Sequence, residues 1–197
     1  MSTITLPAAF KPIKFGLKLY VSQRVTAAPF GGSEQAVDLL NDRWTCHVET
    51  ASLSDSDGAY LEAFIASMRG QANNVALCHY NRKQPSGTVR GTLTLNAAAA
   101  QGANSIVIAG CSPSNGTILT GDMLGVGGLL LQAASDCVAV AGVCTVPIVN
   151  RLRAAQSSGA AVTWSQPTAL FRMMATSGVS YTPDGADPIS FDFSEVI

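Results

Sequence analysis

A phosphate-binding loop is the first chemistry that the sequence suggests, because the stretch GDMLGVGGLLLQ, residues 121–132, holds four glycines within eight positions. Phosphate loops and dinucleotide folds need glycines that open onto a helix, whose N–H groups converge on the anion. A Walker loop also needs a lysine followed by Ser or Thr. Here Gly127 and Gly128 lead into LLLQ, which is typical of a strand, and no lysine follows. We therefore predict a two-residue hairpin turn, in which glycines tolerate positive φ.

Zinc binding is suggested by two Cys-His pairs, Cys46-His47 and Cys78-His79. Neighbouring residues of a strand point to opposite faces, so a cysteine and the histidine that follows it cannot readily share one ion. At best Cys46 and Cys78 meet and supply two ligands. We predict instead that both cysteines lie in the core, that both histidines lie outside it, and that the chain holds no metal.

Calcium binding is suggested by DSDG, which contains Asp55, Asp57 and Gly58. A calcium loop also needs a third acidic or Asn position and a closing glutamate at fixed spacing, and both are missing. The residues Ser54, Asp55 and Ser56 are better explained as the start of a helix, where a serine side chain caps N–H groups and carboxylates face the positive end of the helix dipole.

Catalysis has no recognisable set of residues in this sequence. There is no G-x-S-x-G turn, no cysteine with basic neighbours, and no pair of acids that could be nominated for glycoside hydrolysis. Trp44 and Trp164 could form a sugar platform, but both stand in alternating strand patterns that favour the core. We therefore predict that the protein is not an enzyme, with no catalytic residue and no cofactor.

Composition indicates a globular chain with few charges. Its 197 residues suffice for one domain or two small ones, and 47% are hydrophobic, but only 13% are charged, about half the usual share. The net charge of −1 gives no field that would attract nucleic acid or an anionic membrane, so we predict neither as a partner.

The N-terminus lacks a signal-peptide pattern, and the five cysteines show no repeated spacing, so we expect a cytosolic product with reduced cysteines.

The charges are unevenly distributed along the chain. From residue 91 to residue 150 only Asp122 and Asp136 are charged. A membrane span is disfavoured there, because Gln132 and Asp136 interrupt the apolar run and an aspartate is costly in hydrocarbon. We expect strands that are buried by a core and by a neighbouring subunit, because interface cores are depleted of charge.

The two ends of the chain carry opposite charge. The first 24 residues contain bases and no acid, and the last 23 contain acids and no base; these residues are Lys11, Lys14, Lys18 and Arg24, and Asp184, Asp187, Asp192 and Glu195. The ends could pair within one sheet, where facing opposite charges stabilise each other, or between subunits. Two solvated faces without contact are the remaining interpretation.

Hydrophobic periodicity predicts mostly strands. Alternation predicts strands over residues 13–21 and 43–49, with Trp44, Cys46 and Val48 on one face of the second. Residues 74–80 are typical of a strand, and 82–87 of a loop. From residue 88 onward, short strand candidates separated by turn residues favour a small barrel or sandwich.

One helix and one closing strand complete the prediction. The helix covers about residues 57–69, with Arg69 in its last turn, Gly70 closing it and an apolar stripe of Tyr60, Leu61, Phe64, Ile65 and Met68. The ending ISFDFSEVI alternates again, with Ile189, Phe191 and Phe193 on one side. We expect it to return and pair with the first strand.

Two parts of the sequence are similar to a known family. The first part is LEAFIASMRGQANNVAL followed by NRKQPSGTVRG, and the second is LTGDMLGVGGLLLQAASD followed by VPIVNRLRAAQSSGAAVTWSQPTALFRM. Both parts resemble the distal tail proteins in the tail tips of long-tailed bacteriophages. The resemblance covers about residues 40–175. It consists of a shared order of features along the chain. A helix followed by Arg-Gly comes first, then a Pro-x-Gly turn, then a hairpin that begins with Gly-Asp, and finally a proline followed by Leu-Arg.

The resemblance implies a fold and a function. Such proteins form a ring, usually of six copies, from a β-sandwich domain with one helix and a second β domain. On that basis we expect residues 1–88 and 166–197 to form the ring domain, with 89–165 inserted as a small β-barrel-like domain. The ring would join the tail tube protein to the tail hub protein, with tail fibres or receptor-binding proteins as further partners, in a virion assembled in the host cytoplasm.

Two other classes remain open from the sequence. One is a different phage tail component, such as a tube or baseplate protein built on related β domains, which would form filaments instead of rings. The other is a small β-rich binding module or hydrolase, which a ligand would stabilise against heat.

Overall fold

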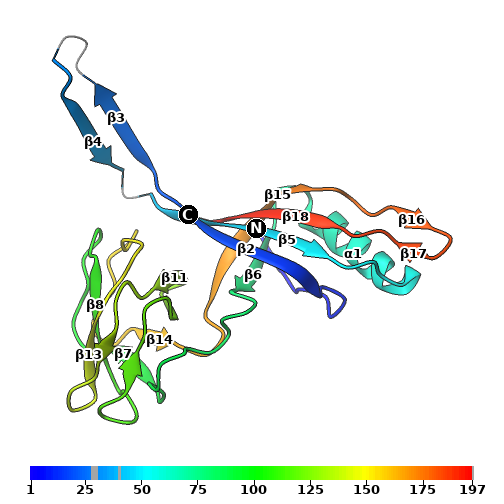
Figure 1. Ribbon diagram of the computed structural model, residues 1–197. Coiled ribbons are helices and arrows are strands. Elements are labelled where there is room, and N and C mark those ends of the chain that lie inside the picture. The colour runs from blue at the N-terminus through cyan, green and yellow to red at the C-terminus, as the bar shows by residue number, and fades with distance from the viewer. Residues whose placement is uncertain (28–30, 40, 197) are drawn as a thin grey trace. The chain divides into compact units, whose positions relative to one another are not determined.

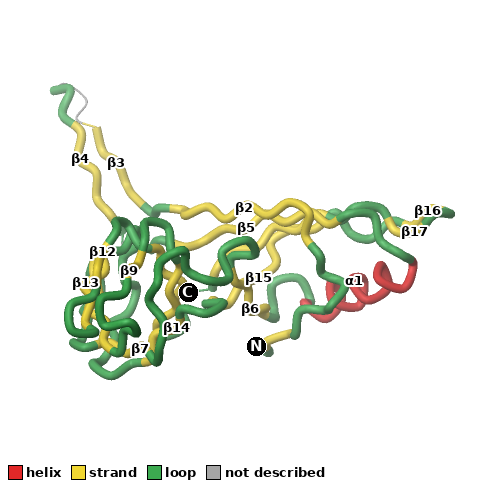
Figure 2. Tube along the Cα trace, turned by 60° about the horizontal axis from the view of Figure 1, so that its bottom comes forward, coloured by secondary structure: helices red, strands yellow, loops and turns green. Residues whose placement is uncertain are grey.

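The computed structural model describes residues 1–27, 31–39 and 41–196, and within these ranges it is mainly β with one helix (Figures 1 and 2). The predicted fold class is therefore confirmed. The chain forms two compact units: unit 1 comprises Met1–Lys18, Trp44–Asn81 and Thr168–Ile197, and unit 2 comprises Leu19–Arg43 and Arg82–Pro167.

The boundaries of the units differ from the predicted ones at residues 19–43, 82–88 and 166–167, all of which group with unit 2. Residues 82–88 belong with unit 2, because the N–H groups of Ser86 and Gly87 bind the carboxylate of Asp122 there. Residues 19–43 also group with unit 2, although we predicted them in the first domain. Sequence order alone cannot reveal such groupings, because they depend on contacts between distant segments.

In the described part of unit 1, six strands form one sheet. Their order is β1-β6-β15-β18-β5-β2, with β1 parallel to β6 and β15 antiparallel to both β6 and β18. The bounds are β1 Thr3–Ile4, β2 Pro12–Tyr20, β5 Arg43–Thr50, β6 Asn74–Cys78, β15 Thr168–Thr176 and β18 Ser190–Glu195, with a small ribbon of β16 Tyr181–Thr182 and β17 Gly185–Ala186. The expected pairing of the last strand with the first is wrong, because β5 lies between β18 and β2.

Alternation in β5 and β18 places their apolar residues on one face. Phe191 lies opposite Val48 and Phe193 lies opposite Cys46, and all four side chains are buried. Trp44 is buried on the same face of β5. The predicted strand over residues 43–49 and the predicted inward side of the chain ending are therefore confirmed.

Helix α1 spans Asp55–Met68, so it begins two residues before the predicted start at about residue 57, and a predicted capping residue stands at its N-terminus. Ser54 is its N-cap, and its Oγ accepts a hydrogen bond from the N–H of Asp57 at 3.2 Å. Asp55 and Asp57 stand in the first turn, where the helix dipole favours negative charge. These acids are therefore part of the helix start.

The apolar stripe of α1 is narrower than predicted. Leu61, Phe64 and Met68 are buried, but Tyr60 is 64% exposed. The helix ends at Met68, and Arg69 is the C-cap in left-handed conformation with φ of 48°, so it does not belong to the last turn. Gly70 follows with φ of 65° and completes the reversal of the chain.

The core of unit 1 lies between α1 and the sheet. The ring centroid of Phe191 lies 6.4 Å from that of Phe64 on α1 and 5.5 Å from that of Phe10. Phe193 stacks on Phe191, with their ring centroids 5.9 Å apart. Aromatic pairs in this range contribute beyond the area that they bury. These contacts hold α1 and the N-terminal segment on one face of the sheet.

The segment that follows β6 reaches the inner side of β2. Phe15 of β2 lies 5.2 Å from the ring of His79, which directly follows β6, although three strands separate β2 from β6 in the sheet. Phe15, Leu17 and Leu19 are half-buried on this inner side, as the alternation of residues 13–21 predicts, whereas Ile13 and Val21 at the two ends of the pattern are exposed.

Within the described residues of unit 2, a second six-stranded sheet closes into a barrel. Its order is β11-β10-β14-β7-β8-β13, with bounds β7 Leu93–Leu95, β8 Ser105–Ala109, β10 Met123–Val126, β11 Leu129–Gln132, β13 Val143–Pro147 and β14 Ala161–Thr163, beside the short pair β9 Thr117–Ile118 and β12 Cys137–Val138. Just beyond β11 and β13, Ala133 pairs with Ile148, and the N–H of Ala134 donates to Pro147 at 2.9 Å. These bonds join the two outer strands.

The barrel interior explains the charge-poor span of the sequence. Its buried cluster consists of apolar residues from 89 to 162, with Leu95, Ile108 and Val146 among the most deeply buried. The low charge of the buried positions within residues 91–150 therefore follows from the barrel's own core, whereas Val138 and Val140 are exposed.

The Gly127-Gly128 pair forms the turn that the sequence predicts. Strands β10 and β11 are antiparallel, with Val126 opposite Leu129, and the two glycines between them have φ of 55° and 80°. Two positive φ values in a two-residue loop are what a type I′ hairpin requires. The glycine-rich stretch is therefore a hairpin and not a phosphate loop.

A second hairpin precedes the barrel in the sequence. Strands β3, Gln23–Ala27, and β4, Glu34–Asp38, are antiparallel, with Val25 opposite Ala36 (Figure 1). The N–H of Leu39 donates to the carbonyl of Ser22 and extends the ladder by one bond. We call the described residues of this hairpin, 21–27 and 31–39, the arm.

Candidate functional site

The structure separates the residues that suggested zinc. Cys46 lies in the core of unit 1, and His47 points to the opposite face of β5, as predicted. Cys78 is only half-buried, because Val75 and Leu77 take the inward positions of β6; its predicted place in the core is wrong. Cys46 and Cys78 therefore do not meet, and the described residues contain no group that could hold a metal ion.

Cys46 and Cys144 are poorly suited to nucleophilic chemistry. Burial, and secondarily the charge of Asp192, raise the pKa of Cys46 to about 12. Burial and the neighbouring thiol of Cys137 raise the pKa of Cys144 to about 12 as well. A cysteine attacks as its thiolate, so a thiol with such a pKa is inert near neutral pH.

The two tryptophans have structural roles. Trp44 is buried, and its backbone N–H donates to Oε2 of Glu195 at 3.0 Å. Trp164 is half-buried against the barrel core, and its indole N–H donates to the carbonyl of Gly91 at 2.7 Å. The guanidinium carbon of Arg90 lies over its ring, 5.1 Å from the ring centroid. The two rings lie in different units, Trp44 in unit 1 and Trp164 in unit 2.

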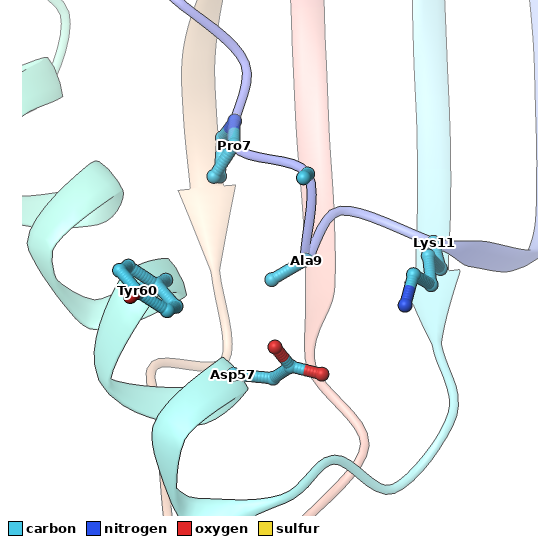
Figure 3. A pocket seen from close by; sticks show the side chains of 6 residues that line it. Pro7, Ala9, Lys11, Asp57 and Tyr60 are labelled. Carbon is cyan, nitrogen blue, oxygen red and sulfur yellow. The ribbon is translucent and has the colours of Figure 1, made fainter.

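One shallow pocket lies where α1 begins (Figure 3). It has a volume of about 340 Å³, and Lys11, Asp57 and Tyr60 line it together with the short side chains of residues 7–9. Among the described residues of its wall, Asp57 carries the single carboxylate. This lining lacks the pair of carboxylates that glycoside hydrolysis uses.

The outer face of the unit 1 sheet carries a chain of charged side chains. Nζ of Lys14 lies 2.8 Å from Oε1 of Glu49, which lies 3.0 Å from Nε2 of His47, and Nδ1 of His47 lies 2.6 Å from Oδ1 of Asp192. We call these four residues the His47 cluster. The two ends of the chain thus do share one sheet, but His47 and Glu49 of β5 connect their charges.

Two carboxylates hold the imidazole of His47 from both sides. Hydrogen bonds with Asp192 first and Glu49 second raise the pKa of His47 above its ordinary value of 6.5, because the protonated ring can donate to both. The ammonium of Lys14, and secondarily His47, lower the pKa of Glu49. The cluster therefore favours a positive His47 between two negative groups.

The His47 cluster predicts a pH-dependent contribution to stability. Because folding raises the pKa of His47, its contribution is complete below about pH 6.5 and is lost as the pH rises through the raised value. We expect His47→Asn to lower the free energy of unfolding by less than about 1 kcal/mol at low pH, since the side chain of His47 is 44% exposed. At high pH the substitution should leave the free energy of unfolding unchanged. Urea unfolding of both proteins at about pH 5.5 and pH 9 measures this; an equal loss at both pH values would contradict it.

Strand β2 forms an open edge of its sheet. In the part of the chain that the structure describes, β2 has one neighbouring strand, β5, and its other side is unpaired over nine residues. Lys14, Gly16 and Lys18 lie on the outer face of this strand, beside Glu49, His47 and Thr45. Such an edge presents a row of free N–H and C=O groups that can bind another strand.

The arm is exposed on both faces. All ten residues of β3 and β4 are exposed, including Val25 and Val37, and Val21 and Leu39 at its base are exposed as well. We did not predict this hairpin from the sequence. Gly31 and Gly32 between QRVTA and EQAVD are the signal that could have found it.

Comparisons with known proteins add no relative. No protein-family model matches the chain, and none of the curated proteins compared with it is significantly similar. Among the described residues, no helix combines the length and the apolar character needed to span a membrane.

Proposed function

We propose that this chain is a structural subunit that joins copies of itself into a closed ring, as a distal tail protein does in the tail tip of a long-tailed bacteriophage. The resemblance over residues 40–175 supports this proposal. A mainly β fold of two units with a single helix in unit 1 agrees with what that resemblance implies.

The observation that carries the proposal is the presence of two unsatisfied β surfaces on one chain. Among the residues that the structure describes, the edge of β2 and the arm each have strand backbone without a partner strand. Exposed strand edges attract further strands, and head-to-tail contact between identical subunits ends without free edges only when the assembly closes. A closed ring therefore satisfies both surfaces on every copy.

The proposed role is mechanical and not enzymatic. The ring would connect the tail tube protein with the tail hub protein and would present the surface on which fibres or receptor-binding proteins are mounted, within the virion. Neither nucleic acid nor a membrane is a proposed partner, in keeping with a net charge of −1. No cofactor or metal is part of the proposal.

Native mass tests this proposal. Light scattering after size exclusion is expected to give about six times the chain mass of 20.4 kDa, and electron microscopy of the same fraction should show rings. Long tubes would instead support a tail tube protein. A monomer at every concentration would contradict the ring, and a ligand that raised its melting temperature would then favour the binding module.

A further inference from the structure

We propose that strand β4 of one copy pairs with the open edge of strand β2 of the next copy. This inference rests on the proposed function, because it assigns the contact by which copies join. It names β4 as the donor strand and β2 as the acceptor strand.

The arm needs a partner for its own stability. An isolated two-stranded hairpin is marginal in water, and three or more strands are usually needed for a stable sheet. In β3 and β4 every residue is exposed, so neither face of the hairpin packs on a core. Addition to the six-stranded sheet of another copy would give β4 a second neighbouring strand.

The charges of the two strands are complementary and equally spaced. Strand β2 carries Lys14 and Lys18 and no acid, whereas β4 carries Glu34 and Asp38 and no base. In each strand the two charges stand four residues apart, and therefore on the same face. Opposite charges on directly facing strand positions stabilise a sheet, and like charges destabilise it.

The residues between these charges also match. When Lys18 faces Glu34 in the antiparallel orientation, Gly16 faces Ala36 and Lys14 faces Asp38. The parallel orientation keeps Gly16 beside Ala36 and exchanges the two acids. Both orientations place small residues together at the centre of the contact, with an ion pair on each side.

Two of these four charges are available for such a contact. Within the subunit Lys14 pairs with Glu49, and Asp38 pairs with Arg151 at 3.3 Å. Lys18 and Glu34 take part in no ion pair among the described residues. Lysines on an edge strand discourage unspecific pairing, and an acidic strand of matching spacing overcomes that barrier. The pair thus provides specificity.

Disulfide trapping tests the contact directly. A Cβ at Gly16 has its nearest neighbour, the carbonyl oxygen of His47, at 3.9 Å, so Gly16→Cys fits, and Ala36 is exposed. Mixing Gly16→Cys protein with Ala36→Cys protein under glutathione disulfide should give a cross-linked dimer, and neither variant alone should exceed the wild type. Val25→Cys, which lies beside Ala36 on β3, is the matched control and should cross-link less.

A charge exchange provides the second test. Lys18→Glu is expected to raise the concentration needed for assembly at least tenfold, and a second change, Glu34→Lys for antiparallel or Asp38→Lys for parallel pairing, should restore it. Lys11→Glu makes the same charge change on an exposed residue just before β2, and it should leave assembly unchanged. Unaltered thermal melting confirms that each variant is folded.

The outcomes separate this contact from the proposed function. Trapping together with rescue supports both. Rings that persist in Lys18→Glu and give no Gly16–Ala36 cross-link would overturn the strand contact while the ring proposal stands. A wild type that stays monomeric and gives no cross-link would overturn both.

Discussion

Asp122→Asn is expected to lower the free energy of unfolding of unit 2 by about 2–3 kcal/mol, and Asp122→Ala by more. The carboxylate of Asp122 is buried and accepts three backbone hydrogen bonds. They come from Ser86 at 2.7 Å, Gly87 at 3.0 Å and Leu119 at 2.9 Å. An asparagine has one acceptor oxygen, so its NH₂ group would face at least one of these N–H donors. The buried donor then lacks a partner, which is the costly case.

A second aspartate of the same unit provides the control. Oδ1 of Asp136 also accepts bonds from the N–H and hydroxyl of Thr120, both at 2.7 Å, but this site is exposed. Because the amide oxygen of an asparagine can still accept both of these bonds and water reaches the site, Asp136→Asn is expected to leave the free energy of unfolding almost unchanged. Chemical denaturation, with hydrogen exchange in peptides from unit 2, measures both variants. Equal losses in the two would contradict the prediction, because only Asp122→Asn leaves a buried N–H donor without an acceptor.

Gly110→Ala is expected to destabilise unit 2 by about 3 kcal/mol or more. Gly110 follows β8 with φ of 84°, and a Cβ there would collide with the carbonyl oxygen of Thr92, the residue just before β7. The strained backbone of an alanine accounts for about 1–2 kcal/mol. The remainder comes from separating β7 and β8, whose pairing of Thr94 with Ala109 lies next to the collision.

Gly128→Ala separates the two causes. Gly128 has a similar φ of 80°, but no atom lies within 4 Å of the position that a Cβ would take. Its substitution should therefore cost only the backbone strain, about 1–2 kcal/mol. Thermal melting of both variants gives the comparison. If Gly110→Ala melts at the same temperature as Gly128→Ala, the collision with Thr92 is relieved without loss and the prediction is wrong.

The sequence alone determined which residues face inward and where the chain turns. Trp44, Cys46 and Val48 alternate in the sequence and are buried together in β5. Ser54 precedes the acids of a first helical turn and caps the helix. These features are local: the two faces of a strand, a cap and a turn each depend on residues a few positions apart.

Some residues at the edges of these patterns were assigned incorrectly for a tertiary reason. Tyr60 belongs to the apolar stripe of α1 by spacing, yet it is exposed. Cys78 was predicted in the core, but Leu77 occupies the inward position of β6 and leaves Cys78 half-buried. Periodicity identifies a face but not how far a packed neighbour covers it.

Only the tertiary structure decided which strands become neighbours, and with them the candidate surfaces. That β5 separates β18 from β2, and that the carboxylate of Asp122 binds N–H groups of residues 86 and 87, depends on segments far apart in the sequence. The open edge of β2 and the exposed arm result from the same choice. Strand order is set by the burial of all inward faces at once, so no single stretch of sequence contains it.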